Sequence, residues 1–551
     1  MKTLLRTWWF GLFLGACLIT FEILTLLVPI FSTPTGDGWL GAGIYNTRDM
    51  AVYLNYLAQA KQSFLITNLF NHLPQIPRFD LFWSTGGWLV RAGLSPLWAH
   101  EILRWVCTIF LGLAVYATAK AVTQTERHAR LASFLIISGL STGWLYDLWM
   151  GVTNKWTPRS PVTADLAGEL AVAPTLLGGA HMILSFALLL LIVRWIWEAI
   201  FSTNKKSLLY ACLAILVLSA FHPYFIPLLG LISLAAFFSS LKSRNLPALL
   251  SQGGSLKAPL INTLLINLSL LPSALYYFWI LVNDQGFRIH QIQVNFLPLD
   301  AWYLWVILLL PFIPALVWNF VFRIWNLGPD PNTQIPNTKF QIQNSWAMVW
   351  IASAIVCMLL PFPWTRKYMQ GLLPALIILT LPFWLMLADK INAKKIILPL
   401  KVCLIVLLAF PYIHLFQTQV FMVTDSYWSK SFYRSTEVFD AWKYIQQTSE
   451  REGLILATDL WSNCWTPAYT TQKVWIGHEH ETPDFKSRIT PYLAWTKTHD
   501  VTDFRDYLNN TPVTRVMAVD TDQVARLKNL MDQAVWEPVY GTAKATVWQR
   551  K

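Results

Sequence analysis

Residues 208–240, LLYACLAILVLSAFHPYFIPLLGLISLAAFFSS, form an almost unbroken apolar run with His222-Pro223 near its middle. A membrane-spanning helix needs about 20 apolar residues at a rise of about 1.5 Å each, so this run is too long for one span. Proline lacks a backbone donor and interrupts a helix. The stretch therefore predicts two spans joined by a turn at His222-Pro223, and this choice decides the topology of the rest of the chain.

The composition is that of a polytopic membrane protein. Of the 551 residues, 55% are hydrophobic and 13% are charged, whereas soluble domains carry about 25% charged residues. Apolar runs predict about 11 spans, at 8–31, 97–119, 131–150, 173–198, 207–221, 223–240, 258–281, 299–322, 345–362, 368–388 and 396–417.

The loop charges predict the orientation. With a turn at His222, Lys120, Lys206 and Lys390 lie on the same side as the N-terminus, as the positive-inside rule requires. A single helix over 207–240 would move Lys390 to the other side. We therefore expect a mainly α-helical bundle with its N-terminus in the cytoplasm and its C-terminus outside. The net charge of +12 follows from this loop bias and indicates no nucleic-acid partner.

The sequence predicts an integral protein of the cell (inner or plasma) membrane that consists of two domains. Residues 1–420 form the transmembrane module, with outer loops 32–96 and 147–172. Residues 421–551 lose the long apolar runs and predict a small extracytoplasmic α/β domain. Its strand-like segments are Leu454–Thr458, Val474–Gly477, Arg515–Val519 and Ala545–Trp548, and its helix-like ones are Glu437–Thr448, Asp500–Leu508 and Asp522–Asp532.

Two adjacent cations, Arg366 and Lys367, interrupt the apolar sequence on the predicted outer side, where the charge rule does not require them. A single cation there commonly anchors a helix end at the interface. Two together favour anion binding, and a helix beginning near Thr365 would add free N–H groups that suit a phosphate.

Other polar residues are predicted to face the same side. They are Asp49, Asp147, Glu169, His181, His222 and Arg288. Each has a structural alternative: Asp49 can stabilise a helix N-terminus, and His222 can cap or pack. A carboxylate near bilayer depth is expensive, which gives Asp147 more weight. Together, cations for a phosphate and a carboxylate base for a hydroxyl suit an enzyme that uses a lipid-phosphate donor.

Several stretches, in order along the chain, resemble the GT-C superfamily of polytopic glycosyltransferases that use polyprenyl-phosphate sugars, most closely its uncharacterised bacterial members. They are RDMAVYLNYLAQA (48–60), ISGLSTGWLYD (137–147), ELAVAPTLLGGAHM (169–182), AFHPY (220–224), WTRKYMQGLLPAL (364–376) and VWIGHEHETPDFKSR (474–488). The resemblance implies that Asp49 is the catalytic base and that Arg366 and Lys367 hold the donor phosphate. The acidic pair common in the family's first loop is here Arg48-Asp49, and Arg48 and Tyr53 are candidate substrate contacts.

The expected function is therefore transfer of a sugar from a polyprenyl-phosphate donor to a glycan, lipid or protein acceptor. A transporter or flippase for a lipid-linked sugar and a non-catalytic scaffold for cell-envelope polymers are the alternatives. The segment GHEHET (477–482) places two histidines on one face of a strand, but no third ligand follows at a recognised metal spacing. We expect a structural or site-capping role for it and no cofactor, with a divalent cation left open.

Overall fold

The computed structural model describes residues 2–41, 43, 47–139, 172–243, 256–293, 309–325, 338–360, 364–393, 398–426, 428–448, 453–498 and 501–551. It divides into two compact units, each assembled from separate parts of the chain. The helical unit consists of Met1–Glu22, Arg104–Tyr277 and Asn295–Gln417. The mixed unit consists of Ile23–Leu103, Phe278–Val294 and Thr418–Lys551. The mixed unit thus joins the C-terminal region to the first predicted outer loop, and the domain boundary at 420 stays a prediction.

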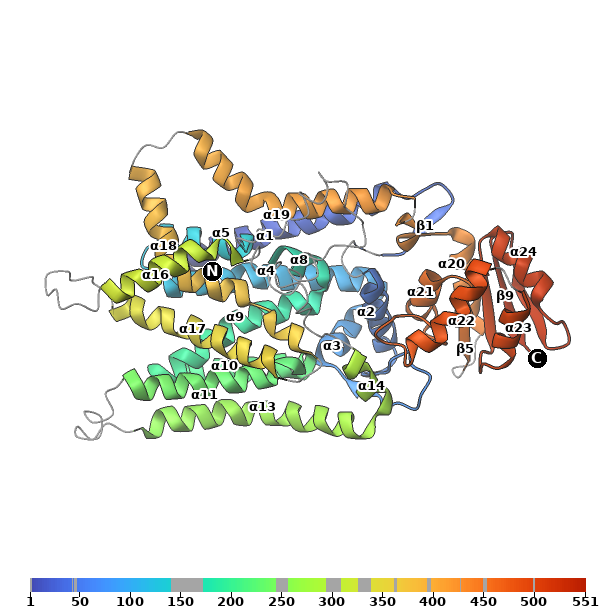
Figure 1. Cartoon of the computed structure of the whole chain (residues 1–551), viewed down its shortest axis with the longest axis horizontal. Helices are drawn as coiled ribbons and strands as arrows, with labels where there is room; N and C mark the ends of the chain where they lie inside the picture. Colours follow the sequence, from blue (N-terminus) through green and yellow to red (C-terminus); the bar gives the residue numbers. More distant parts are fainter. Residues whose placement is uncertain are drawn as a thin grey trace. The chain divides into compact units, whose positions relative to one another are not determined.

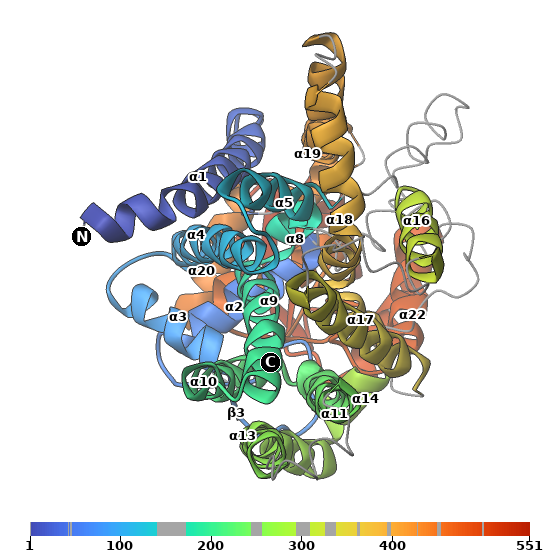
Figure 2. The ribbon, with the colours of Figure 1, turned by 90° about the vertical axis from the view of Figure 1, so that its left-hand side faces the viewer.

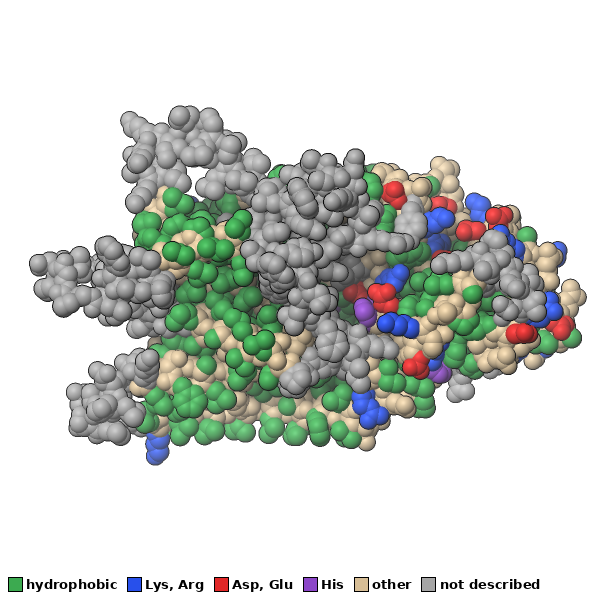
Figure 3. Space-filling view, viewed as in Figure 1, with side chains coloured by type: hydrophobic (Ala, Val, Ile, Leu, Met, Phe, Trp, Pro, Cys, Tyr) green, Lys and Arg blue, Asp and Glu red, His purple; other side chains and the backbone are tan. Residues whose placement is uncertain are grey.

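Long apolar helices make this an integral membrane protein. Within the described ranges, six helices are long and apolar enough to cross a membrane: Trp8–Phe31, Pro96–Val122, Ala180–Phe201, Pro223–Leu241, Lys257–Asn283 and Lys367–Asp389. Each of the eleven predicted ranges overlaps a described helix. The count of about 11 spans and the orientation stay predictions. Apolar side chains cover the long helices α11 and α13 in Figure 3, and Leu264, Leu268 and Leu275 of α13 are among the exposed ones.

The helices of the helical unit are arranged around α9 (Figure 2). They are α1 (Lys2–Phe31), α4 (Pro96–Val122), α5 (Glu126–Ser138), α8 (Val172–Gly178), α9 (Ala180–Phe201), α10 (Lys205–Phe221), α11 (Ile226–Ser243), α13 (Lys257–Asn283), α16 (Phe312–Trp325), α17 (Thr338–Leu359), α18 (Leu372–Ala393) and α19 (Leu398–Thr424), of which α1, α4, α13 and α19 continue into the mixed unit. Helix α9 is buried along most of its length and packs against α8, α10, α11 and α17.

Small residues let α1 and α4 approach closely. A Cβ on Gly112 of α4 would lie 2.5 Å from the backbone nitrogen of Gly15 and 2.6 Å from the carbonyl oxygen of Gly11, both on α1. Glycines four residues apart commonly form such contacts between membrane helices, because no side chain separates the backbones. The contact is therefore specified by glycine on both helices.

The turn predicted at His222-Pro223 is confirmed. Helix α10 ends at Phe221, a short 3-10 helix η1 (Pro223–Phe225) follows His222, and α11 begins at Ile226. Proline at the first position of η1 has no backbone N–H to lose. His222 is therefore held in a turn between two apolar helices.

The predicted C-terminal α/β fold is confirmed by a five-stranded sheet of order β6-β5-β7-β9-β8 (Figure 1). Strand β5 is parallel to β6 and β7, and β9 is antiparallel to β7 and β8. The strands are β5 (Leu454–Ala457), β6 (Lys473–Val474), β7 (Arg515–Val519), β8 (Trp536–Gly541) and β9 (Ala545–Arg550), and the helices are α20 (Thr436–Thr448), α21 (Leu460–Thr470), α22 (Phe485–Thr498), α23 (Val501–Asn509) and α24 (Thr521–Leu530). Its core includes Val516, Leu527, Trp536 and Trp548.

The first-loop region of the mixed unit is built from short elements. They are β1 (Asp37–Trp39), α2 (Thr47–Ala60), β2 (Leu65–Ile66), β3 (Arg78–Phe79), α3 (Leu81–Arg91) and α14 (Gln285–Gln293), together with β4 (Tyr433–Ser435) and the 3-10 helix η4 (Ser429–Ser431) from the C-terminal region. Strand β1 pairs with β4 in antiparallel register. Helix α2 packs against both α3 and α21. It is therefore covered by protein on two sides.

Candidate functional site

Asp49 lies in the first turn of α2, where a carboxylate is favoured by the partial positive charge of the helix N-terminus. After Asp49, the side chains of Met50, Leu54 and Leu57 are buried, so helix α2 is fixed against its neighbours. The Asp49 side chain itself is 33% exposed. Its Oδ1 lies 2.8 Å from Nε2 of His478, which comes from the loop after β6. A partly accessible carboxylate is thus anchored on a rigid helix and joined to the C-terminal region.

Both ring nitrogens of His478 are engaged. The His480 backbone N–H donates to Nδ1 at 3.1 Å, which favours the tautomer that donates from Nε2–H to Asp49. The ring is 5% exposed. Burial opposes protonation of His478, but the hydrogen bond and charge of Asp49, together with Glu481 and Glu479, outweigh it and raise its pKa. The imidazole therefore stays paired with the Asp49 carboxylate in either protonation state.

Neighbouring residues of the same loop make further contacts with the first-loop region. Arg48 donates from Nη1 to Glu479 Oε2 at 2.8 Å, and its guanidinium lies 4.9 Å from the ring centre of Trp461. Asn68 donates from Nδ2 to the carbonyl oxygen of Glu481 at 2.9 Å and to its Oε2 at 2.8 Å. We name residues 477–482 the clamp segment, because His478, Glu479 and Glu481 each contact the first-loop region.

The clamp segment is a compact turn. The backbone N–H groups of Glu481 and Thr482 both donate to the carbonyl oxygen of His478, at 3.2 and 2.9 Å. The Gly477 N–H donates to the Thr482 hydroxyl at 3.2 Å. These bonds fix His478 and Glu481 relative to each other, so the contacts to Asp49 and Asn68 are made by one rigid piece.

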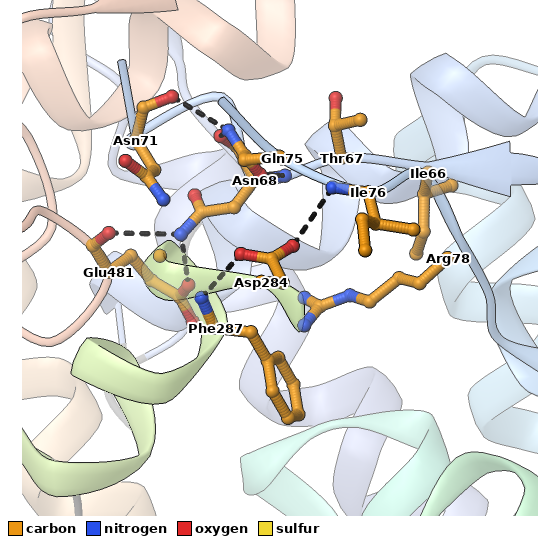
Figure 4. Close-up of a pocket in the computed structure, with 11 residues that line it drawn as sticks. Ile66, Thr67, Asn68, Asn71, Gln75, Ile76, Arg78, Asp284, Phe287 and Glu481 are labelled. Carbon is orange, nitrogen blue, oxygen red and sulfur yellow. Dashed lines mark hydrogen bonds between the residues drawn. The ribbon is translucent and has the colours of Figure 1, made fainter. Parts of the chain in front are cut away.

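A polar pocket lies beside the clamp segment in the mixed unit (Figure 4). It is lined by Ile66, Thr67, Asn68, Asn71, Gln75, Ile76, Arg78, Asp284, Gly286, Phe287 and Glu481, and its volume, including the part open to solvent, is about 280 Å³. Asp284 accepts from the N–H groups of Ile76 and Phe287, at 3.0 and 2.8 Å. The lining offers both hydrogen-bond donors and acceptors, a mixture that suits hydroxyl groups or water.

The helical unit contains a second polar cluster. His181 lies in the first turn of α9, and its ring is stacked on that of His222 with the centroids 5.8 Å apart. Lys367 lies within electrostatic range of His222. His222 is 3% exposed, and neither ring nitrogen has a hydrogen-bond partner among the described residues. A buried imidazole whose nitrogens make no hydrogen bond to the described residues retains its capacity to bind a polar group.

The segment that carries the two cations differs from its prediction. Thr365–Met369 form a short 3-10 helix, η3, and α18 begins only at Leu372. Gly371 separates them with a φ of +81°, a value that favours glycine. A helix does begin at Thr365, but its five residues of 3-10 helix supply no helix-terminus site for a phosphate. The backbone of Arg366 lies in η3, and its side chain is outside the described part of the structure.

The other predicted site residues have different surroundings. Tyr53 stacks on Trp83, with ring centroids 5.1 Å apart, in an aromatic cluster. Arg288 is exposed on α14 and does not line the polar pocket. Asp147 and Glu169 lie outside the described residues. The structure thus joins Arg48 and Asp49 to the clamp segment in the mixed unit, and gathers His181, His222 and Lys367 in the helical unit.

Three polar residues of the mixed-unit site were not singled out as site residues from the sequence: His478, Glu481 and Asn68. The clamp segment was visible as GHEHET, a short run dense in titratable side chains. Its partners were not, because Asp49 lies 429 positions away from His478 and no spacing rule connects them. Within the described ranges, no group of three or more His, Cys, Asp or Glu side chains is placed to hold a metal ion.

No protein-family model and no curated protein matches this chain. Among solved structures, ArnT from Cupriavidus metallidurans bound to undecaprenyl phosphate is similar at 13% identity and a TM-score of 0.45, covering 97% of this chain and 98% of that one. An Archaeoglobus fulgidus oligosaccharyltransferase tethered to an acceptor peptide is similar at 12% identity and a TM-score of 0.48, covering 100% and 75%. Both are GT-C glycosyltransferases. The likeness is too distant to assign a role to any residue of this chain.

Proposed function

We propose that this chain is a membrane glycosyltransferase that moves a sugar from a polyprenyl-phosphate donor to an acceptor hydroxyl. The observation that carries the proposal is the Asp49 carboxylate, which is partly exposed while it is held at 2.8 Å by a buried imidazole. A general base must be reachable by its substrate and fixed in place. Asp49 meets both requirements, and it is the residue that the resemblance to the GT-C superfamily selects.

The reaction would be a single displacement. The acceptor hydroxyl gives its proton to Asp49 while its oxygen bonds to the anomeric carbon of the sugar. The bond from that carbon to the phosphate oxygen breaks, and the lipid phosphate leaves with the electron pair. Attack from the face opposite the phosphate inverts the configuration at that carbon.

The leaving phosphate needs positive charge and hydrogen-bond donors. Lys367 lies near His222, whose ring nitrogens have no partner among the described residues, so this cluster could supply both. Arg366 is adjacent in sequence and is proposed for the same role. The polar pocket of the mixed unit, with amide, carboxylate and guanidinium groups together, is suited to hydroxyl groups of a substrate.

Transfer of a radiolabelled sugar from a polyprenyl-phosphate donor by the purified protein in lipid nanodiscs tests the proposal. We expect Asp49→Asn to lower turnover by about 10²–10⁴-fold, because an amide cannot take the acceptor proton. Asp37→Asn, a change at the first residue of strand β1 in the same loop region, is the matched control and should keep wild-type activity.

Full activity of Asp49→Asn would remove Asp49 as the base. A wild-type protein that leaves the donor linkage intact would instead favour a flippase or a scaffold.

A further inference from the structure

The C-terminal domain reaches the proposed base directly. The clamp segment contacts Asp49 through His478, whose side chain is buried at 5% exposure. The Asp49 side chain in this contact is 33% exposed. The Arg48–Glu479 pair is more open, at 26% and 48% exposure, and exposed ion pairs contribute little. The His478 contact is therefore the one that can matter for chemistry.

His478 is not placed to act as the base itself. Its Nε2 faces Asp49, its Nδ1 accepts the His480 N–H, and the ring edge packs on Phe70 with centroids 6.2 Å apart. No ring nitrogen is left to take a proton from a substrate. The exposed member of the pair is the carboxylate, which leaves the histidine to act through it.

We propose that His478 is a positioning residue whose Nε2–H holds the Asp49 carboxylate in its working orientation and keeps it ionised, so that the C-terminal domain supplies part of the active site. This inference rests on the proposed function, because it assumes that Asp49 is the base. It assigns the clamp segment a role in the reaction that neither a purely structural loop nor a metal site would have.

The charges around the pair support this role. Arg48 and Asp49 on α2 face the clamp segment, which contributes Glu479, His480 and Glu481. Burial and the charge of His478 lower the pKa of His480, whereas the carboxylates raise that of His478. In the acidic range, where a carboxylate protonates, His478 therefore carries the positive charge that favours the ionised form of Asp49.

The test is the pH profile of kcat/KM for sugar transfer in nanodiscs with two replacements of His478. His478→Leu removes both the hydrogen-bond donor and the positive charge that favour the ionised carboxylate. The acid limb of its kcat/KM profile, where Asp49 becomes protonated, should therefore move to higher pH by about 1 unit or more. His478→Gln keeps an N–H donor but cannot be charged, so its acid limb should move by less. Misorientation of the base should also lower kcat of His478→Leu by about 10²-fold, with partial rescue in His478→Gln.

The matched control is His128→Asn, a change at a histidine on α5 that pairs with Asp389 at 3.3 Å in the helical unit. It should leave the profile unchanged. Size-exclusion profiles and thermal midpoints of all variants show whether they fold. If His478→Leu does not fold, the graded shift in His478→Gln decides the question.

An unmoved acid limb in both His478 variants would overturn the proposal, even with reduced kcat, because a structural role lowers activity without changing the titration of Asp49. Failure of the proposed function gives a different pattern: the wild type would not turn over donor, or Asp49→Asn would stay active.

Discussion

At the scale of single residues, His72 couples the first loop to the C-terminal region in a pH-dependent way. Arg488 Nη2 lies 3.3 Å from His72 Nε2, and the Trp475 ring packs against the imidazole with centroids 4.9 Å apart. Burial and the nearby Arg488 and Lys473 charges lower the pKa of His72 to about 4. The neutral ring accepts a hydrogen bond that a protonated ring would lose.

The sign of the effect follows from linkage. The pKa of His72 is lower in the folded chain than its ordinary value of 6.5, so stability is fully present above that pH and declines as pH falls toward 4. Because the ring is partly exposed, we expect a loss of about 1 kcal/mol after solvent screening. His72→Asn should reduce the drop in thermal midpoint between pH 7 and pH 5, measured in detergent, and His128→Asn should not. Equal drops in wild type and His72→Asn would contradict this.

The sequence could single out candidate residues that carry a local signal, but it could not relate a residue to its distant partners. Asp49 was selected by the resemblance of its motif to the GT-C superfamily, and its role as the base stays a prediction. Its partner His478 was seen only as part of a dense polar segment, because the hydrogen bond joins positions that the sequence does not relate. Arg366 and Lys367 were noticed for their charge, but the positive φ of Gly371, directly before α18, has no signal in an apolar run.

At the scale of elements, the α1–α4 contact gives a sharp prediction. A Cβ at Gly112 would meet backbone atoms of α1 at 2.5 and 2.6 Å, so Gly112→Ala must push the helices apart. We expect a cost of about 1–3 kcal/mol, measured as a lower thermal midpoint in detergent.

Gly230 of α11 is the matched control. Its nearest neighbour to an added Cβ is Asn267 Oδ1 at 3.5 Å, an ordinary contact distance. Gly230→Ala should be neutral or stabilise by up to about 1 kcal/mol, because alanine favours a helix more than glycine does. Similar losses at both positions would show that the α1–α4 contact is not what makes Gly112 sensitive.

Elements with strong periodic or proline signals were predictable, and elements that depend on packing were not. The turn at His222 followed from one proline in a long apolar run, and β7 was predicted with its exact bounds. Strand β8 was missed because it contains Pro538, which is tolerated there since β8 is an edge strand. Helix α21 was missed because Pro467 lies inside it, yet buried Cys464 and Trp465 hold it in place.

At the scale of the whole molecule, the orientation can be tested by cysteine labelling in intact cells. We expect Asn529→Cys, on the exposed side of α24, to react with an impermeant maleimide. Lys205→Cys, at the exposed start of α10, should react only after the membrane is permeabilised. The wild-type chain is the control for labelling of native cysteines. Of these, Cys17 lies inside an apolar helix, where an impermeant reagent should not react with it. Labelling of both positions in intact cells would refute the predicted orientation.

The 429 positions between Asp49 and His478 have a consequence for biosynthesis. A ribosome that adds about 5–20 residues per second needs roughly 20–90 seconds to travel from one to the other. During that interval the first loop has been synthesised, but His478 has not. If the pairing is needed for turnover, a nascent chain that lacks His478 would be inert, and the enzyme would become competent only when the region that carries His478 has been translated and folded.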